Sequence, residues 1–256
     1  MHLHSKVYGS ESLPVLIILH GLLGSSDNWH SFGQRFGARF HTFILDARNH
    51  GRSPHSESFN YQVMAEDVVE FMKQQNISST ALLGHSMGGK TAALTALLYP
   101  ELVDKLIVVD IAPRSYKTHH DQVFDVLTSI NLNDFKYRKD IDEALTVKIP
   151  EISVRQFLMK NLARDETGSF RWKMNLEVIE KNYAQINQEL PQDRQFKKPS
   201  LFIRGGNSDY IRIDDLPLIA QLFPGSEVIT INNAGHWIHI DAPDEFSGII
   251  FDFLSL

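Results

Sequence analysis

A serine flanked by glycines, in the stretch LLGHSMGGKT at residues 82–91, is the residue of this sequence best suited to nucleophilic chemistry. Ser86 stands two positions after Gly84 and two before Gly88, with an apolar run before it and a helix-like run after it. This pattern predicts a sharp strand-to-helix turn that lifts the hydroxyl clear of a sheet, at the positive end of the next helix. Glycine tolerates the crowding of such a turn because it lacks a Cβ atom. The alternative is a chance match on an ordinary turn, which the flanking segments disfavour.

A serine nucleophile needs a proton acceptor, because its free hydroxyl attacks poorly at neutral pH. Of the 12 histidines, His236 has the most suitable context: a small-residue loop between an apolar segment and a C-terminal helical pattern, downstream of the serine. His239 is the nearest competitor, but it lies beyond that loop. His85, next to the serine, is expected to pack against its surroundings. We therefore predict His236 as the general base.

The segment LHGLLGSSDNW, residues 19–29, follows the first apolar run and contains a His-Gly-x-x-Gly loop. Such a loop can point a backbone N–H at the oxygen that becomes negative during attack on a carbonyl group. The Leu22 N–H is the candidate donor, paired with the Met87 N–H from the serine turn. A glycine-rich turn without a ligand is the alternative, and it is less favoured because the serine turn is also present.

The elements that must position these residues alternate along the chain. Short apolar runs typical of buried strands occur at residues 15–19, 42–45, 81–83, 106–109, 201–203 and 228–231. Helical patterns occur at residues 61–75, 90–98, 217–222 and 243–254. Strands that alternate with helices predict an α/β fold with a mostly parallel, doubly wound sheet.

The middle of the chain lacks this alternation. Between residues 114 and 195 no segment has convincing strand character, and helical patterns occur at 122–130, 140–147, 153–162 and 176–188. We therefore predict that residues 1–113 and 196–256 form the core, and that residues 114–195 form an all-helical insertion between two of its strands.

Together the motifs resemble the α/β-hydrolase superfamily, and most closely the small bacterial YbfF-like esterases and the related ABHD-type proteins. The motifs that carry the resemblance span nearly the whole chain outside the insertion; they are HGLLGSSDNW, DARNHGRSPHS, LLGHSMGG, VVDIAP, GGNSDY and AGHWIHIDAP. The resemblance implies an α/β-hydrolase fold with an eight-stranded type of sheet and a helical cap over the active site. The insertion at 114–195 lies where such a cap belongs.

The acid that would orient the histidine has two candidates. Asp110, in LIVVDIAP, follows the strand after the serine turn, and Asp209, in FIRGGNSDY, follows the penultimate strand. Many members of the superfamily carry the acid at the place of Asp209, whereas the YbfF-like group is similar in its aspartate of the VDIAP type. We favour Asp110 and keep Asp209 as the alternative acid. The other aspartate is expected to cap a helix or to hydrogen-bond within a loop.

Two further polar segments are expected to be structural. The segment DARNHGRS, residues 46–53, is expected to form an ordered loop behind the oxyanion turn, as is usual in the superfamily. A contact between Arg48 or Arg52 and an anionic substrate is the less favoured alternative. His119 and His120 lack a partner set of carboxylates or cysteines, so we predict no metal site.

The composition narrows the class of protein. A chain of 256 residues with 43% hydrophobic and 22% charged residues is typical of a soluble globular protein. The net charge of -6, without a long run of one sign, argues against binding to nucleic acid or to anionic membranes. The absence of cysteine excludes disulfides and thiolate zinc sites. The N-terminus lacks a signal-peptide pattern, and the apolar run nearest it is far shorter than the ~20 residues that cross a bilayer, so we expect a cytoplasmic protein.

These features predict a cofactor-free serine carboxylesterase. We expect it to hydrolyse short- to medium-chain acyl esters or thioesters, acyl-CoA among them, through an acyl-serine intermediate. A carbon–carbon bond hydrolase, a cofactor-free haloperoxidase or a lyase could use the same framework. A non-catalytic binding protein on a hydrolase scaffold is less favoured, because both Ser86 and His236 are present. The expected partner is a small molecule, and a homodimer is compatible with the sequence.

Overall fold

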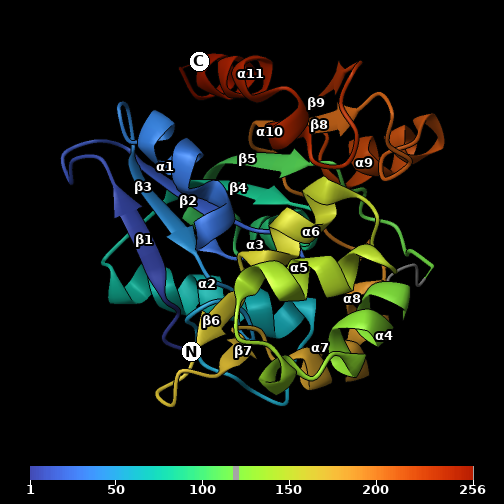
Figure 1. The fold of residues 1–256 in the computed structure, drawn as a ribbon. Coiled ribbons are helices and arrows are strands. Elements are labelled where there is room, and N and C mark those ends of the chain that lie inside the picture. The colour runs from blue at the N-terminus through green and yellow to red at the C-terminus, as the bar shows by residue number, and fades with distance from the viewer. Residues whose placement is uncertain (118–120, 256) are drawn as a thin grey trace.

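A twisted, mostly parallel sheet runs through the core of the molecule (Figure 1). The structure is a computed structural model and describes residues 1–117 and 121–255. Within this part of the chain the sheet has seven strands in the order β1-β3-β2-β4-β5-β8-β9. They are β1 (Ser5–Tyr8), β2 (Val15–Leu19), β3 (His41–Leu45), β4 (Thr80–His85), β5 (Val103–Val109), β8 (Ser200–Gly205) and β9 (Ser226–Ile231). Only β1 pairs antiparallel with its neighbour in this sheet.

The inner strands are buried on both faces, which explains their continuous apolar sequences. Four of the five residues of β2 are buried, as are the last four residues of β5. All six strands predicted from the apolar runs are confirmed. The strand β1 was not predicted, because it is a short, mostly polar edge strand that is only partly buried. The seven strands in the described residues also correct the eight-stranded type that the resemblance implied.

Helices cover both faces of the sheet (Figure 1). One face packs against α1 (His30–Phe36) and α11 (Pro243–Ser255); the other packs against α2 (Tyr61–Gln74), α3 (Met87–Leu98) and α9 (Leu216–Leu222). The helix α3 is buried from its first residue to Leu97, since it lies against β2, β4 and β5. Shorter helical segments are α10 (Ile238–Asp241), η1 (Ser26–Trp29), η2 (Pro100–Leu102), η3 (Leu132–Asp134) and η4 (Ile213–Asp215).

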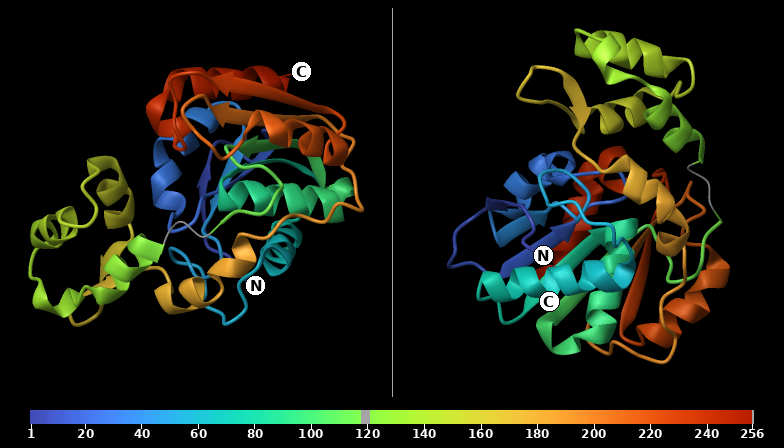
Figure 2. Two further views of the ribbon diagram at one scale, coloured as in Figure 1. Left: turned by 90° about the vertical axis from the view of Figure 1, so that its right-hand side faces the viewer. Right: turned by 90° about the horizontal axis from the view of Figure 1, so that it is seen from below.

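The insertion contains a small hairpin as well as helices. Its elements are α4 (Asp121–Ser129), α5 (Arg138–Thr146), α6 (Ile152–Met159), β6 (Leu162–Arg164), β7 (Phe170–Trp172), α7 (Leu176–Lys181) and α8 (Tyr183–Ile186). The prediction of an all-helical insertion is therefore wrong in one place: β6 and β7 pair antiparallel. Strands of three residues are too short to give a period-two pattern, and the tight connection depends on Gly168 with φ +86°. Figure 2 shows α4, α5, α6 and the hairpin standing out to one side of the core.

The connectivity brings one end of several strands together. Because β2, β4, β5, β8 and β9 are parallel, the loops that follow them all lie at the same edge of the sheet. In open α/β sheets this edge is where ligands bind. The connections that follow these strands contain the candidate site residues from the sequence, which are Leu22, Ser86, Asp110, Asp209 and His236.

Candidate active site

The serine turn is tight and has an unusual backbone conformation. Ser86 has φ 53° and ψ −119° and stands at the N-cap of α3. A Cβ atom on Gly84 would lie 2.1 Å from the carbonyl oxygen of Gly88, and one on Gly88 would lie 2.3 Å from the carbonyl oxygen of Leu19. No side chain fits at such distances, so both glycines are required for the turn to form. The turn holds the hydroxyl at the positive end of α3.

Ser86, His236 and Asp110 form a hydrogen-bonded chain. The Oγ atom of Ser86 lies 3.1 Å from Nε2 of His236, and Nδ1 of His236 lies 2.8 Å from Oδ2 of Asp110. The carboxylate can only accept, so the proton of a neutral imidazole belongs on Nδ1. This tautomer leaves the Nε2 lone pair facing the Ser86 hydroxyl. The arrangement can remove the hydroxyl proton as the oxygen attacks an electrophile.

Asp110 is fully buried and its carboxylate is well satisfied. The Gly205 N–H donates to Oδ1 at 3.0 Å, and the Ser208 hydroxyl donates to Oδ2, which also binds His236. Gly205 is the last residue of β8, and Ser208 lies in the loop that follows it. Ser208 lies within the motif GGNSDY, but sequence reasoning considered only the aspartate there and missed the serine, because a hydroxyl in a loop gives no periodic signal.

Asp209 lies elsewhere in the same loop. Its side chain is exposed and makes no hydrogen bond to another described residue. Its backbone carbonyl accepts a hydrogen bond from Arg114 at 3.1 Å. Of the two candidate acids, the structure brings Asp110 to His236 and leaves Asp209 away from it.

The turn after β2 brings Leu22, a candidate donor to the oxyanion, to the edge of the sheet where Ser86 lies. The Leu22 N–H has no hydrogen-bond partner among the residues the structure describes. Met87 is the first residue of α3, where backbone N–H groups lack intrahelical acceptors. The next residue, Leu23, is held firmly: its N–H donates to Nε2 of His50 at 3.2 Å, and its carbonyl accepts from Nδ2 of Asn161 at 2.6 Å.

His50 shows why the DARNHGRS segment is so polar. Burial lowers the pKa of His50 to about 3, so its imidazole is neutral and can accept the Leu23 N–H. Its Nδ1 lies 2.9 Å from the carbonyl oxygen of Arg48, which fixes the tautomer. Asp46 contributes in the same way, because its carboxylate accepts the Ser26 N–H at 2.6 Å. Residues 46–53 therefore hold the turn after β2 in place through hydrogen bonds to its backbone.

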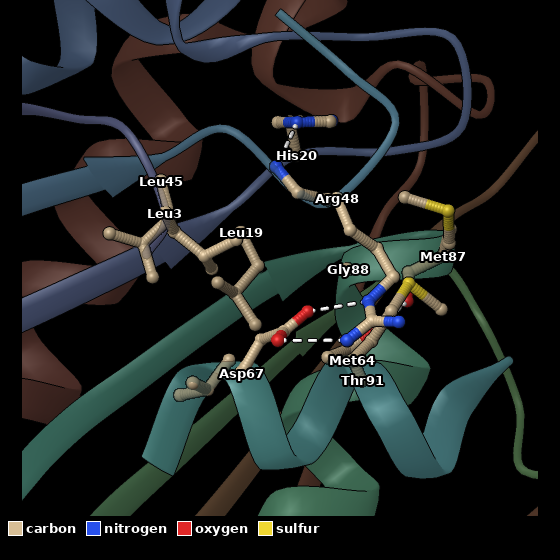
Figure 3. A pocket seen from close by; sticks show the side chains of 12 residues that line it. Leu3, Leu19, His20, Leu45, Arg48, Met64, Asp67, Met87, Gly88 and Thr91 are labelled. Carbon is tan, nitrogen blue, oxygen red and sulfur yellow. Dashed lines mark hydrogen bonds and ion pairs between the residues drawn. The ribbon is translucent and has the colours of Figure 1, made fainter. Parts of the chain in front are cut away.

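Arg48 does not face a substrate site. Its guanidinium forms a buried, bidentate ion pair with Asp67 of α2, with N–O distances of 2.6 and 2.9 Å (Figure 3). A cavity beside this pair measures about 20 Å³, which suits about one water molecule. Neither Ser86 nor His236 lines it. Arg52 is exposed, and its backbone N–H donates to Asp46.

Two neighbouring histidines surround His236 without contacting Ser86 through hydrogen bonds. Nε2 of His85 lies 2.9 Å from the backbone carbonyl oxygen of His236, and burial lowers the pKa of His85 well below its usual value. His239 lies in α10, stacks on Trp29 with ring centroids 4.4 Å apart, and has a pKa lowered by burial to about 3. His85 packs as expected, and His239 packs against the rings of Trp29 and Phe32.

A cleft of about 390 Å³ lies between the insertion and the core. Phe157 and Lys160 line it from the insertion, and Phe32, Arg35 and His239 line it from the core. Its size is in the range of small-molecule sites. The ring of Phe157 also contacts Trp237, with centroids 5.7 Å apart. Neither Ser86 nor His236 lines this cleft.

Neither a metal cluster nor a bilayer-spanning helix occurs in the described part of the chain. Across residues 1–117 and 121–255, no group of three or more His, Cys, Asp or Glu side chains is arranged to hold a metal ion. None of the helices there combines the length and apolar character that crossing a bilayer requires. His119 and His120 lie outside the described residues.

Comparisons with known proteins agree with this architecture. The family described as "alpha/beta hydrolase fold" matches residues 14–141 and 161–243. The solved structure of a "Marine microorganism esterase" is similar with a TM-score of 0.95 and 43% identity, covering 98% of both chains. The "sn-1-specific diacylglycerol lipase ABHD11" of Mus musculus is 37% identical over 96% of this chain and 83% of that protein. "Esterase YbfF" of Escherichia coli is 34% identical over 90% of this chain and 88% of that protein.

The family match covers well over half of the chain, and the relatives align along almost all of it. The resemblance inferred from the motifs is thereby confirmed, as is the α/β-hydrolase fold with its mostly parallel sheet. The similar proteins are named as esterases and a lipase. The chain is a hydrolase and belongs to the α/β-hydrolase family.

Proposed function

We propose that the protein is a serine carboxylesterase that hydrolyses short- to medium-chain acyl esters, thioesters included, through an acyl-serine intermediate. The observation that carries the proposal is the chain of hydrogen bonds from Ser86 through His236 to Asp110, at 3.1 and 2.8 Å. The esterases and the lipase among the similar proteins support the same class of reaction.

The reaction has two halves. Oγ of Ser86 forms a bond to the substrate carbonyl carbon while Nε2 of His236 takes the hydroxyl proton, and Asp110 stabilises the imidazolium. His236 then gives that proton to the leaving alcohol or thiol as its bond to the acyl carbon breaks. Water next attacks the acyl-serine, losing a proton to His236, and the acid is released as the proton returns to Ser86. No cofactor is consumed in this sequence.

The Leu22 and Met87 N–H groups are the proposed donors to the oxyanion. Both lie at the edge of the sheet that carries Ser86, one after β2 and one at the start of α3. The bracing of Leu23 by His50 and Asn161 supports this role, because a donor must be fixed before the charge develops. Each donor of this kind typically lowers the barrier by ~3–4 kcal/mol.

Residues 114–195 are proposed to act as a cap that shapes the acyl site. The insertion is compact and bonds to the turn that carries Leu22, through Asn161 and the Leu23 carbonyl, so it leaves room for a chain of limited length. A panel of p-nitrophenyl esters and acyl-CoA thioesters of increasing chain length tests this part of the proposal. Turnover that increases steadily to the longest chains would contradict it. The cytoplasmic location and the homodimer stay predictions.

Replacing the nucleophile tests the proposal directly. Ser86→Ala is expected to lower kcat/KM on p-nitrophenyl butyrate by about four orders of magnitude, because the acyl-serine can no longer form. A fluorophosphonate probe should label the native protein at Ser86 and leave the variant unlabelled. Activity of the variant within tenfold of the native value would remove Ser86 from the mechanism.

A further inference from the structure

The aromatic ring of Tyr210 lies against the face of the His236 imidazole. The two ring centroids are 3.8 Å apart and the planes differ by 18°, which is a stacked arrangement. Tyr210 belongs to the loop after β8, in the motif GGNSDY, and is half-buried. The His85 ring is the other aromatic neighbour of the imidazole, at 4.8 Å and 42°. The reacting imidazole is therefore covered on one face by Tyr210.

Tyr210 is held in this place by another tyrosine. The hydroxyl of Tyr116 donates to the backbone carbonyl oxygen of Tyr210 at 2.5 Å, and it accepts the Ala112 N–H at 2.7 Å. Ala112 stands two residues after Asp110. The Tyr116 and Tyr210 rings also contact each other, with centroids 5.5 Å apart. The ring that covers the imidazole is thus fixed to the same backbone segment as the carboxylate that orients it.

We propose that Tyr210 is a further catalytic residue, whose ring face stabilises the imidazolium that His236 becomes during the reaction. The inference rests on the proposed function, because the imidazolium forms only if His236 accepts the proton of Ser86. The face of an aromatic ring carries negative charge and attracts a cation placed over it. A neutral imidazole gains much less from this contact. The interaction therefore grows as the transition state is approached, which is what lowers a barrier.

The phenol of Tyr210 acts through its ring and not as an ionised oxygen. Burial raises the pKa of Tyr210 to about 12, so the hydroxyl stays protonated at neutral pH. The other titratable groups that face the imidazole are the Asp110 carboxylate, which binds its Nδ1, and the imidazoles of His85 and His239. Burial lowers the pKa of both of these histidines, so they stay neutral in the same range.

The test removes the ring and records the pH dependence of kcat/KM on p-nitrophenyl butyrate. Tyr210→Leu is expected to lower the plateau of kcat/KM by roughly 2- to 30-fold. It is also expected to move the acidic limb of the profile to lower pH by about 0.4 to about 1.5 units, because the protonated imidazole loses a stabilising contact. A loss of shielding alone would let water solvate the imidazolium and move the limb to higher pH. The direction therefore separates the two effects.

Tyr210→Phe is the matched control, since it keeps the ring face and removes only the hydroxyl. Compared with Tyr210→Leu, it should recover the plateau of kcat/KM and return the acidic limb towards higher pH. If Tyr210→Leu does not fold, Tyr210→Met fills a similar space without a ring face. Tyr116→Phe, which releases the carbonyl of Tyr210, should move the limb in the same direction by less. An unmoved acidic limb in the folded ring-less variant, or one moved to higher pH, overturns the proposal.

A failure of this inference can be told from a failure of the proposed function. Labelling of Ser86 by the fluorophosphonate probe reports whether the serine is a nucleophile, whatever Tyr210 does. If native protein is labelled and Tyr210→Leu has the native pH profile, the esterase proposal stands and the role of Tyr210 is wrong. If native protein is neither labelled nor active on esters, the esterase proposal itself is wrong.

Discussion

Ser86 and Asp110 share a rare backbone feature. Both have a positive φ, 53° and 50°, although neither is glycine. Such a conformation costs of the order of 1–3 kcal/mol and persists only where the surroundings fix it. Here the Ser86 N–H donates to the carbonyl of Val109 at 2.9 Å, and the Asp110 N–H donates to the carbonyl of Ile203 at 2.8 Å. The backbone of each residue is thus held by a hydrogen bond to the adjacent strand.

Exchange of the carboxylate at residue 110 tests the assignment of the acid. Asp110→Asn is expected to lower kcat on p-nitrophenyl butyrate by about 10⁴-fold, because an amide NH₂ facing Nδ1 favours the wrong imidazole tautomer. Asp209→Asn, the matched control, should leave kcat within about twofold, since that side chain is exposed. Equal losses in the two variants would contradict the assignment.

The limits of prediction at this scale have a physical cause. Ser86 could be found because glycines at fixed spacing signal a tight turn. Asp110 and Asp209 could not be separated by local sequence, since each follows the carboxyl end of a parallel strand. Which aspartate reaches His236 depends on how the connections after β5 and β8 pack together. Long-range contacts decide this packing, such as the hydrogen bond from the Gly205 N–H to Asp110. Ser208 and Tyr210 carried no pattern that distinguishes them from ordinary loop residues.

At the scale of elements, a buried lysine joins α3 to the base of the insertion. Lys90 is 1% exposed, and its ammonium donates to the carbonyl oxygens of Arg114 at 2.7 Å and Gln188 at 2.5 Å. These two carbonyls belong to the chain segments that lead into and out of the insertion. The rings of Tyr61 and Tyr116 lie 5.4 and 4.8 Å from Nζ. The helix that carries Ser86 at its N-cap is thus tied to both connections at once.

The titration of Lys90 gives the stability a pH dependence. Burial, with a smaller contribution from the Arg114 charge, lowers the pKa of Lys90 from 10.5 to about 7. Between these values the unfolded chain holds a proton that the folded chain has lost, so the free energy of unfolding rises with pH. Lys90→Met removes the titrating amine and therefore its contribution to the pH dependence of stability. The difference in free energy of unfolding, native minus variant, should grow from about pH 7 to about pH 9.5 by up to ~1.4 kcal/mol per pH unit.

Urea unfolding at several pH values measures that difference. Lys105→Met is a suitable control, because the Lys105 ammonium also donates to two backbone carbonyls, those of Phe253 and Leu254, but is only half-buried. Its difference from the native protein should stay nearly constant over the same range. A constant difference for Lys90→Met as well would mean that the buried amine does not lose its proton in the folded protein.

The strands and helices that are most buried were the easiest to predict from the sequence. The two-sided burial of the inner strands gives long apolar runs, and amphipathic α2 gives a clear helical period. The hairpin of β6 and β7 lies outside the main sheet and is too short to leave a pattern. The predicted helix at 176–188 is split into α7 and α8 at Asn182, whose side chain donates to the carbonyl of Val178.

Across the whole molecule, the insertion docks on the loops that surround Ser86. The buried side chain of Asn161 donates to the carbonyl of Leu23, and Lys173 forms an ion pair with Asp27 at 2.7 Å. A backbone bond from the Asn175 N–H reaches the carbonyl of Asn49. The hairpin region of the insertion is therefore bonded to the turn that carries Leu22, and we expect its position to affect the geometry of that turn.

Removal of one docking contact tests this dependence. Asn161→Ala is expected to lower the free energy of unfolding by about 1–3 kcal/mol, because the Leu23 carbonyl is left buried without a donor. It should also lower kcat about tenfold, a fraction of the ~3–4 kcal/mol that full loss of one oxyanion donor costs. Asn187→Ala, which removes a bond to the Tyr183 carbonyl within the insertion, should lower stability alone. Unchanged kcat in both variants would show that docking does not govern the turn.

The strand order determines which part of the sheet is expected to unfold first on warming. His236 follows β9, which among the described strands pairs only with β8 and of whose residues only the last, Ile231, is buried. Edge elements of this kind open locally at a lower free energy than the centre of a sheet. Detachment of β9 would carry the imidazole away while the central strands stay folded. Enzymatic activity therefore reports on the stability of this edge of the sheet. On warming, we expect activity to be lost at a lower temperature than the helical signal in circular dichroism.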